Sequence, residues 1–87
     1  MEVVFTLQAK KDLDFWKKSG NKSVQQKIET LIKDILLHSQ TGIGKPEELK
    51  YQWSGCWSRR IDNEHRIIYE IDQENIVIHS LKGHYEK

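Results

Sequence analysis

The stretch CWSRRIDNEHRIIYEIDQENIVIHSL, residues 56–81, decides the fold. It contains three runs rich in β-branched and aromatic residues, which favour the pleated backbone of β-strands. The runs cover residues 56–61, 66–71 and 76–81. The polar segments between them, 62–64 and 72–75, have the residue types of tight turns. We therefore predict three consecutive strands in an antiparallel meander.

The first of these runs alternates in a way that assigns its side chains to two faces. Successive side chains of a strand point to opposite faces of the sheet. One face is predicted to carry Trp57, Arg59 and Ile61, and the other Cys56, Ser58 and Arg60. The two neighbouring arginines are therefore expected to point in opposite directions.

The N-terminal half is predicted to form a strand at residues 2–6 and helices at 8–18 and 23–39. The second helix is indicated by apolar residues at helical spacing, and Ser23 with Gln26 resembles a capping box at its start. Because its apolar stripe must be covered, we expect it to pack on the sheet.

Residues 40–48 contain two glycines and the only proline, so they are predicted to form a loop, followed by a short strand at 49–53. A strand, two helices and then several strands in succession indicate an α+β fold. We predict one domain, residues 1–87, with both N-terminal helices on one face of a mainly antiparallel sheet of four to five strands.

Composition narrows the function classes. The 87 residues are 37% hydrophobic and 31% charged, with a net charge of +1, which is typical of a soluble globular domain. The apolar runs are too short to span a bilayer and no secretory signal is evident, so we expect a cytoplasmic protein without membrane contact. One cysteine excludes an internal disulfide. No metal site or cofactor is predicted, because the histidines lack the paired spacing of zinc ligands.

Three groups of residues could together cleave RNA. Glu47 or Glu48, in the loop after the proline, could act as a general base on a ribose 2′-hydroxyl. Sequence spacing does not separate these two glutamates, and a solvated surface carboxylate is the structural alternative. Arg60 and Arg66, on adjacent predicted strands, could hold one phosphate, or could form surface ion pairs.

The third group is His84 with Tyr85, near the C-terminus. A histidine can be protonated near neutral pH and donate to a departing 5′-oxygen, and the tyrosine could hold the phosphate or stack on a base. The structural alternative is a frayed tail.

The segments GKPEELK (44–50) and SGCWSRRIDNEHRIIYEI (54–71), with the late HY pair, closely resemble the YoeB/Txe toxins of the RelE superfamily. The resemblance runs the full chain. It implies a RelE-like, microbial-ribonuclease-like fold and a ribosome-dependent mRNA endoribonuclease, an mRNA interferase that forms the toxin half of a type II toxin–antitoxin pair. By matched position it assigns the general base to Glu47, the phosphate-stabilising arginine to Arg66, supporting cations to Arg60 and Lys50, the general acid to His84, and the family's final tyrosine to Tyr85.

The implied partners are a cognate antitoxin and mRNA bound in the A site of the small ribosomal subunit. A homodimer is compatible with the resemblance. Exposed lysine pairs such as Lys10-Lys11 and Lys17-Lys18 would contact ribosomal RNA. The chain departs from the family pattern at Cys56 and Gly83, where aromatic residues are familiar, and in its last two residues. Two other hypotheses stand beside this one: a non-catalytic module that inhibits translation by obstruction, and a ribonuclease that cuts naked RNA.

Overall fold

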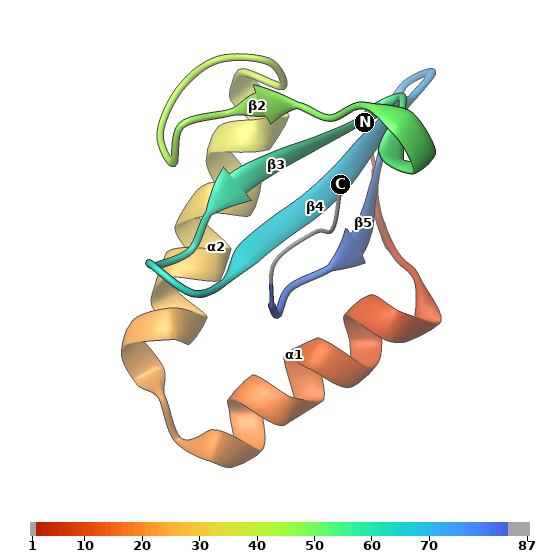
Figure 1. Ribbon diagram of the computed structural model, residues 1–87. Coiled ribbons are helices and arrows are strands. Elements are labelled where there is room, and N and C mark those ends of the chain that lie inside the picture. Colours follow the sequence, from red (N-terminus) through yellow and green to blue (C-terminus); the bar gives the residue numbers. More distant parts are fainter. Residues whose placement is uncertain (1, 84–87) are drawn as a thin grey trace.

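Strand β1 (Val3–Phe5) begins the part of the chain that the computed structural model describes, residues 2–83 (Figure 1). Two helices follow it, and the remaining elements are strands and one 3-10 turn. In order they are α1 (Leu7–Ser19), α2 (Lys22–Leu37), β2 (Glu47–Glu48), η1 (Tyr51–Trp53), β3 (Cys56–Arg60), β4 (Arg66–Asp72) and β5 (Asn75–Ser80). Neither described helix is long and apolar enough to cross a membrane.

Within the described residues, five strands form one sheet in the order β1-β5-β4-β3-β2. The predicted meander of β3, β4 and β5 is antiparallel, and β2 also pairs antiparallel with β3. Strand β1, at the edge of the sheet, runs parallel to β5. The predicted α+β architecture, with two N-terminal helices on one face of a mainly antiparallel sheet, is confirmed (Figure 1).

The core lies between the helices and the sheet face that they cover. Helix α2 contributes an apolar stripe at helical spacing, as its sequence predicts, and Trp57 and Ile61 of the first predicted strand face inward. The buried members of this cluster are Ala9, Trp16, Val24, Ile28, Leu31, Ile35, Ile61, Ile67, Tyr69, Ile76, Ile78 and Leu81. Among the described residues, neither α-helix covers the opposite face of the sheet, and Figure 1 views the molecule from that side.

The start of α2 differs from the prediction. Its N-cap is Asn21, whose side-chain oxygen accepts from the N–H of Val24 at 3.1 Å. The predicted capping box of Ser23 and Gln26 is therefore wrong by two residues. Gly20 has φ +73°, the left-handed conformation that ends α1, so the chain turns early and the next polar side chain becomes the cap.

The predicted strand at 49–53 is also wrong. The residues that pair with β3 are Glu47 and Glu48, which precede the predicted strand. The N–H of Leu49 then donates a final hydrogen bond to the carbonyl of Cys56 at 2.9 Å. Tyr51 then has φ +59°, which ends the extended backbone and begins η1. Leu49 is buried against Cys56 on the face that lacks helices.

Candidate active site

Arg60 and Arg66 lie at the end of the β3–β4 hairpin and are register partners. Side chains of directly opposed residues share a face, and this is the face without helices. Arg60 is exposed, whereas Arg66 is partly buried and its Nη1 donates to the carbonyls of Asp62 (2.7 Å) and His65 (3.0 Å). These bonds orient one guanidinium while leaving the other in solvent.

The register of β2 separates the two candidate glutamates. Glu47 pairs with Ser58, so its side chain lies on the same face as Arg60, two residues further along β3. Glu48 pairs with Trp57, whose side chain faces the helices, so Glu48 points the other way. Both glutamates are exposed. Of these two glutamates, only Glu47 shares a sheet face with the arginine pair.

Gly44 anchors the loop that leads into β2. Its carbonyl accepts from the N–H of Arg60 at 2.7 Å, which ties the loop to the arginine end of β3. Its φ is +81°, and an added Cβ would lie 2.8 Å from Leu31 Cδ2 and 3.2 Å from the Arg60 carbonyl oxygen. Lys50 is exposed at the start of η1, near the opposite end of β3 from Arg60, so the register does not bring it to the arginine pair.

Arg59 is fully buried. The alternation of its strand predicted only that it points to the face opposite Arg60. Its Nη1 lies 2.5 Å from Asp34 Oδ2 and 3.1 Å from the carbonyl of Ile43. Nη2 donates to the carbonyls of Thr41 (2.7 Å) and His38. The guanidinium therefore holds together the loop that connects α2 to Glu47.

The same network shifts two pKa values. The hydrogen bond from Arg59 holds the pKa of Asp34 below its usual range, more than partial burial raises it. Burial raises the pKa of the Tyr69 hydroxyl, although Arg59 Nε donates to that oxygen at 3.1 Å. Tyr69 donates in turn to the Ser39 carbonyl at 2.7 Å, which adds a further contact to the loop.

The last described residues are tied to the arginine end of the hairpin. The N–H of Arg66 donates to the carbonyl of Gly83 at 3.0 Å, and the N–H of Gly83 donates to Nδ1 of His65 at 2.8 Å. The predicted general acid His84 and its neighbour Tyr85 lie outside the described residues. Up to Gly83, the chain is held beside the main chain of Arg66.

Helix α1 holds the main chain of Leu81, two residues before Gly83. Asp12 Oδ2 accepts from the N–H of Leu81 at 2.9 Å, and Trp16 Nε1 donates to the carbonyl of Leu81 at 2.8 Å. Trp16 also packs edge-on against the His65 ring, with 4.8 Å between ring centroids. Sequence reasoning missed this clamp. The available signal was the spacing of Asp12 and Trp16, four residues apart on one helix face.

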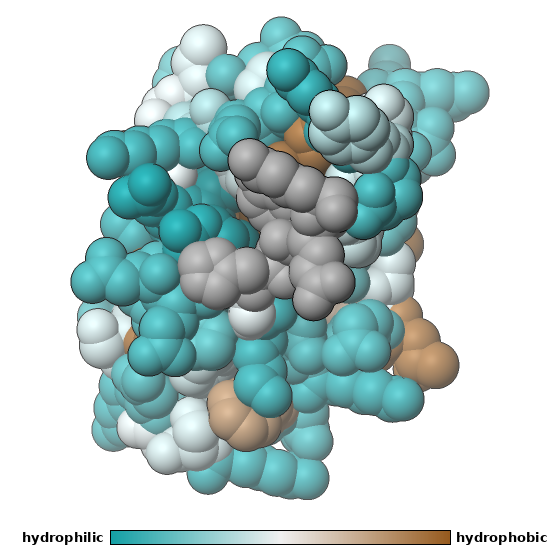
Figure 2. Space-filling model, viewed as in Figure 1, coloured by the Kyte–Doolittle hydropathy of each residue, from teal (hydrophilic) through white to brown (hydrophobic). Residues whose placement is uncertain are grey.

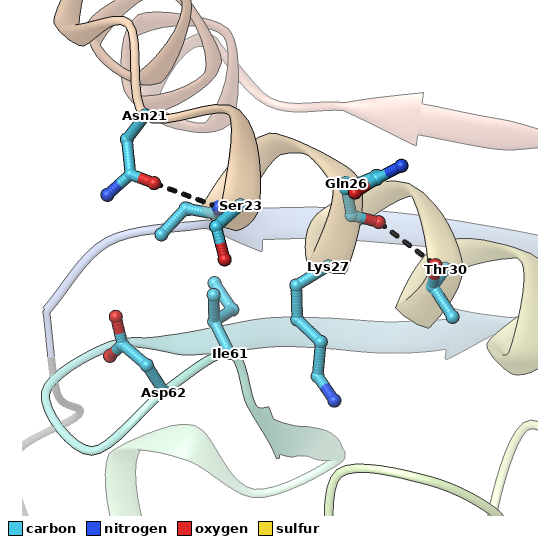
Figure 3. A pocket seen from close by; sticks show the side chains of 8 residues that line it. Asn21, Ser23, Gln26, Lys27, Thr30, Ile61 and Asp62 are labelled. Carbon is cyan, nitrogen blue, oxygen red and sulfur yellow. Dashed lines mark hydrogen bonds between the residues drawn. The ribbon is translucent and has the colours of Figure 1, made fainter.

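A hollow of about 690 Å³ lies between the first half of α2 and the end of β3 (Figure 3). Lys27 and Asp62 lie on opposite sides of it in that view. Neither Glu47 nor Arg66, the predicted catalytic residues within the described part of the chain, lines it. The candidate active site is instead the face of the sheet toward the viewer in Figure 2, which is mainly hydrophilic outside the grey atoms.

Comparison with known proteins agrees with this architecture. A family model described as the YoeB-like toxin of bacterial type II toxin-antitoxin systems matches residues 5–85. Toxin YoeB of Synechocystis sp. is 40% identical over 87 residues, which cover all of both chains. A YoeB/ParE toxin from Agrobacterium tumefaciens superimposes with a TM-score of 0.93 at 34% identity, covering 98% of this chain and 100% of that one.

Two Staphylococcus aureus structures are also similar. A YoeB-YefM complex gives a TM-score of 0.87 at 42% identity over 95% of each chain, and a YoeB dimer gives 0.88 at 40% over 98% of each. YafQ of E. coli, at 15% identity, shares the fold alone, with a TM-score of 0.77 over 93% of this chain and 90% of its own. Since the family model spans residues 5–85 and a full-length relative shares 40% of positions, the chain belongs to the YoeB-like toxins of bacterial type II toxin-antitoxin systems.

Proposed function

We propose that this toxin is a ribosome-dependent mRNA endoribonuclease that works by acid–base catalysis. The observation that carries the proposal is the shared face of the sheet: Glu47 and the pair Arg60 and Arg66 lie on it, whereas Glu48 points away. A carboxylate on the same face as two guanidiniums, on a hydrophilic open surface, suits a phosphodiester backbone rather than a small enclosed substrate.

The proposed reaction is an in-line displacement at phosphorus. Glu47 removes the proton from the ribose 2′-hydroxyl, and the 2′-oxygen forms a bond to the adjacent phosphorus. Negative charge grows on the phosphate oxygens, where Arg66 and Arg60 stabilise it. The bond to the 5′-oxygen breaks, His84 donates the proton to that oxygen, and Tyr85 contacts the phosphate. The products are a 2′,3′-cyclic phosphate and a 5′-hydroxyl.

The ribosome would supply the substrate geometry in this proposal. An open surface binds a flexible strand without orienting it, and orientation alone can lower a barrier by about 7–11 kcal/mol in favourable cases. With a net charge of only +1, binding would rely on local cations. The exposed Lys10-Lys11 pair on α1 and Lys50 beside η1 are candidates. Of the second lysine pair, Lys18 is already in an ion pair with Asp14.

A protein partner is part of the proposal. The S. aureus relative has been solved as a YoeB-YefM complex, and we propose that a cognate antitoxin likewise binds this toxin in the cytoplasm. Masking the face that carries Arg60 and Arg66 would prevent cleavage until the antitoxin is removed. Self-association is a second possibility, in line with the dimer of the same relative.

The decisive experiment incubates the purified toxin with programmed ribosomes and maps the cuts on the message. Glu47→Gln is expected to lose about 10²–10⁴-fold in cleavage rate, the usual contribution of a general base. Glu48→Gln is the matched control, because it removes the same charge from the adjacent exposed position on the other face. Equal cleavage by both variants would refute the assignment.

The same assay separates the competing functions. A module that acts by obstruction would arrest translation while leaving the message intact, and His84→Ala would not change the arrest. A free-standing ribonuclease would cut naked and ribosome-bound transcripts at similar rates. We expect cleavage of ribosome-bound message only.

A further inference from the structure

Three residues of types that commonly ligate metal ions lie close together on the open face of the sheet. Cys56, Glu70 and His79 each offer a sulfur, a carboxylate oxygen or a ring nitrogen, and these three atoms all lie within 4.8 Å of one another. Nε2 of His79 is 2.8 Å from Oε1 of Glu70. The three residues come from three different strands, so no local sequence motif predicts the cluster.

The sheet itself aims these side chains together. Cys56 and Glu70 are register partners on β3 and β4. Between β4 and β5 the pairing passes from Ile68 with Ser80 to Tyr69 with Ile78, so His79 is the extra residue of a β-bulge. Ile76 and Ile78 face the core, so the alternation of β5 turns His79 to the open face, where its ring contacts Glu70.

We propose that Cys56, Glu70 and His79 form a binding site for Zn²⁺ or a chemically similar divalent transition metal. Thiolate and imidazole ligands select zinc-like ions over Mg²⁺ or Ca²⁺. Zinc bonds of about 2.0–2.3 Å place ligand atoms of a tetrahedron about 3.3–3.7 Å apart. A separation near the 4.8 Å limit must therefore shorten by about 1 Å, whereas Nε2 of His79 and Oε1 of Glu70, at 2.8 Å, must move apart by about 0.5 Å.

The surroundings fit a site with three protein ligands. Leu49 and Ile68 pack against Cys56, which shields the sulfur. Glu70 and His79 keep 42% and 29% of their side-chain surface exposed, so a water molecule can take the fourth position. The Cys56 thiol gives up its proton to solvent when the metal binds. A bound ion would connect β3, β4 and β5.

The cluster lies away from the arginine pair of the proposed active site, and the proposed base Glu47 lies between them, because it pairs with Ser58. Cys56 and Glu70 pair at one end of the β3–β4 ladder, and Arg60 and Arg66 pair at the other. Four residues of strand correspond to about 13 Å. The metal would therefore stabilise the sheet at the end away from the arginines, and the proposal does not depend on the proposed function.

Cobalt(II) substitution tests the site on the full-length protein, freed of any histidine tag and of bound metal. We expect one equivalent of Co²⁺ to bind with a sulfur-to-cobalt charge-transfer band in the near ultraviolet, which Zn²⁺ then displaces. Cys56→Ser should abolish the band. Glu70→Gln and His79→Gln should each weaken binding by more than the roughly tenfold that even a hydrogen-bonding partner of a ligand contributes.

Matched controls are His38→Gln and Glu64→Gln, which remove the same groups from exposed positions outside the cluster. A second measurement is the melting temperature, which Zn²⁺ should raise in the original protein and in the controls but not in Cys56→Ser. If Cys56→Ser does not fold, the Co²⁺ affinities of Glu70→Gln and His79→Gln, which alter the two partly exposed ligands, decide whether the site exists. Absence of the band, its survival in Cys56→Ser, or equal losses in ligand and control variants would overturn the proposal.

Discussion

Replacing Arg59 with lysine should destabilise the domain by about 3 kcal/mol or more. Lysine keeps the positive charge but offers three donors from one point, whereas the buried guanidinium spreads its donors over five acceptors. At least two of these acceptors therefore lose their partner. A hydrogen bond to a charged group contributes about 1.5–3 kcal/mol, which sets the expected minimum.

The assay is urea unfolding followed by tryptophan fluorescence. A small domain has a slope of about 1 kcal/mol per molar urea, so the midpoint should fall by about 3 M. Arg60→Lys is the control, because the same substitution at the exposed neighbour should change stability by no more than about 0.5 kcal/mol. Hydrogen exchange adds a local measurement: the N–H of Ile43, which donates to Asp34, should exchange faster in the Arg59 variant. Similar midpoints for the two variants would refute the account of the buried network.

Three further outcomes are expected. Asp34→Asn should weaken the dependence of the unfolding free energy on pH in acid. The pKa of Asp34 in the folded protein lies below the ordinary 3.8, so its carboxylate contributes stability above pH 3.8 that is lost as the pH falls through the folded pKa. An unchanged pH dependence in the variant would contradict this. Trp16→Phe leaves the Leu81 carbonyl without its 2.8 Å donor and should cost about 1–3 kcal/mol, which calorimetry would register as a lower melting temperature. Gly44→Ala should lower the melting temperature more than Gly55→Ala does, since both have positive φ but only Gly44 lacks space for a Cβ; equal losses would show that crowding is unimportant.

Local patterns in the sequence determined much of the fold. Three β-type runs separated by polar turns predicted the meander. Alternation in the first run predicted that Trp57, Arg59 and Ile61 share a face, because a strand's side-chain period is a property of the strand alone, and the structure shows that this face is turned inward. Helical spacing likewise predicted α2. The errors, at the cap of α2 and at 49–53, came from positive φ values at Gly20 and Tyr51. Local propensity does not specify backbone conformation at single residues of this kind.

The candidate site depended on the sequence in a different way. Residue types and family motifs suggested Glu47 with Arg60 and Arg66, and the hairpin turn placed the two arginines on neighbouring strands. The roles of these residues stay predictions, as do those of His84 and Tyr85.

Only the tertiary structure decided which side chains share a face across strands. The register of β2 against β3 put Glu47 on the arginine face and Glu48 on the other. Packing buried Arg59 among the carbonyls of a distant loop, and the pairing of β3, β4 and β5 put Cys56, Glu70 and His79 close together. The physical reason is that periodicity orients a residue only within its own element. The pairing of distant segments depends on register and packing, which no single segment encodes.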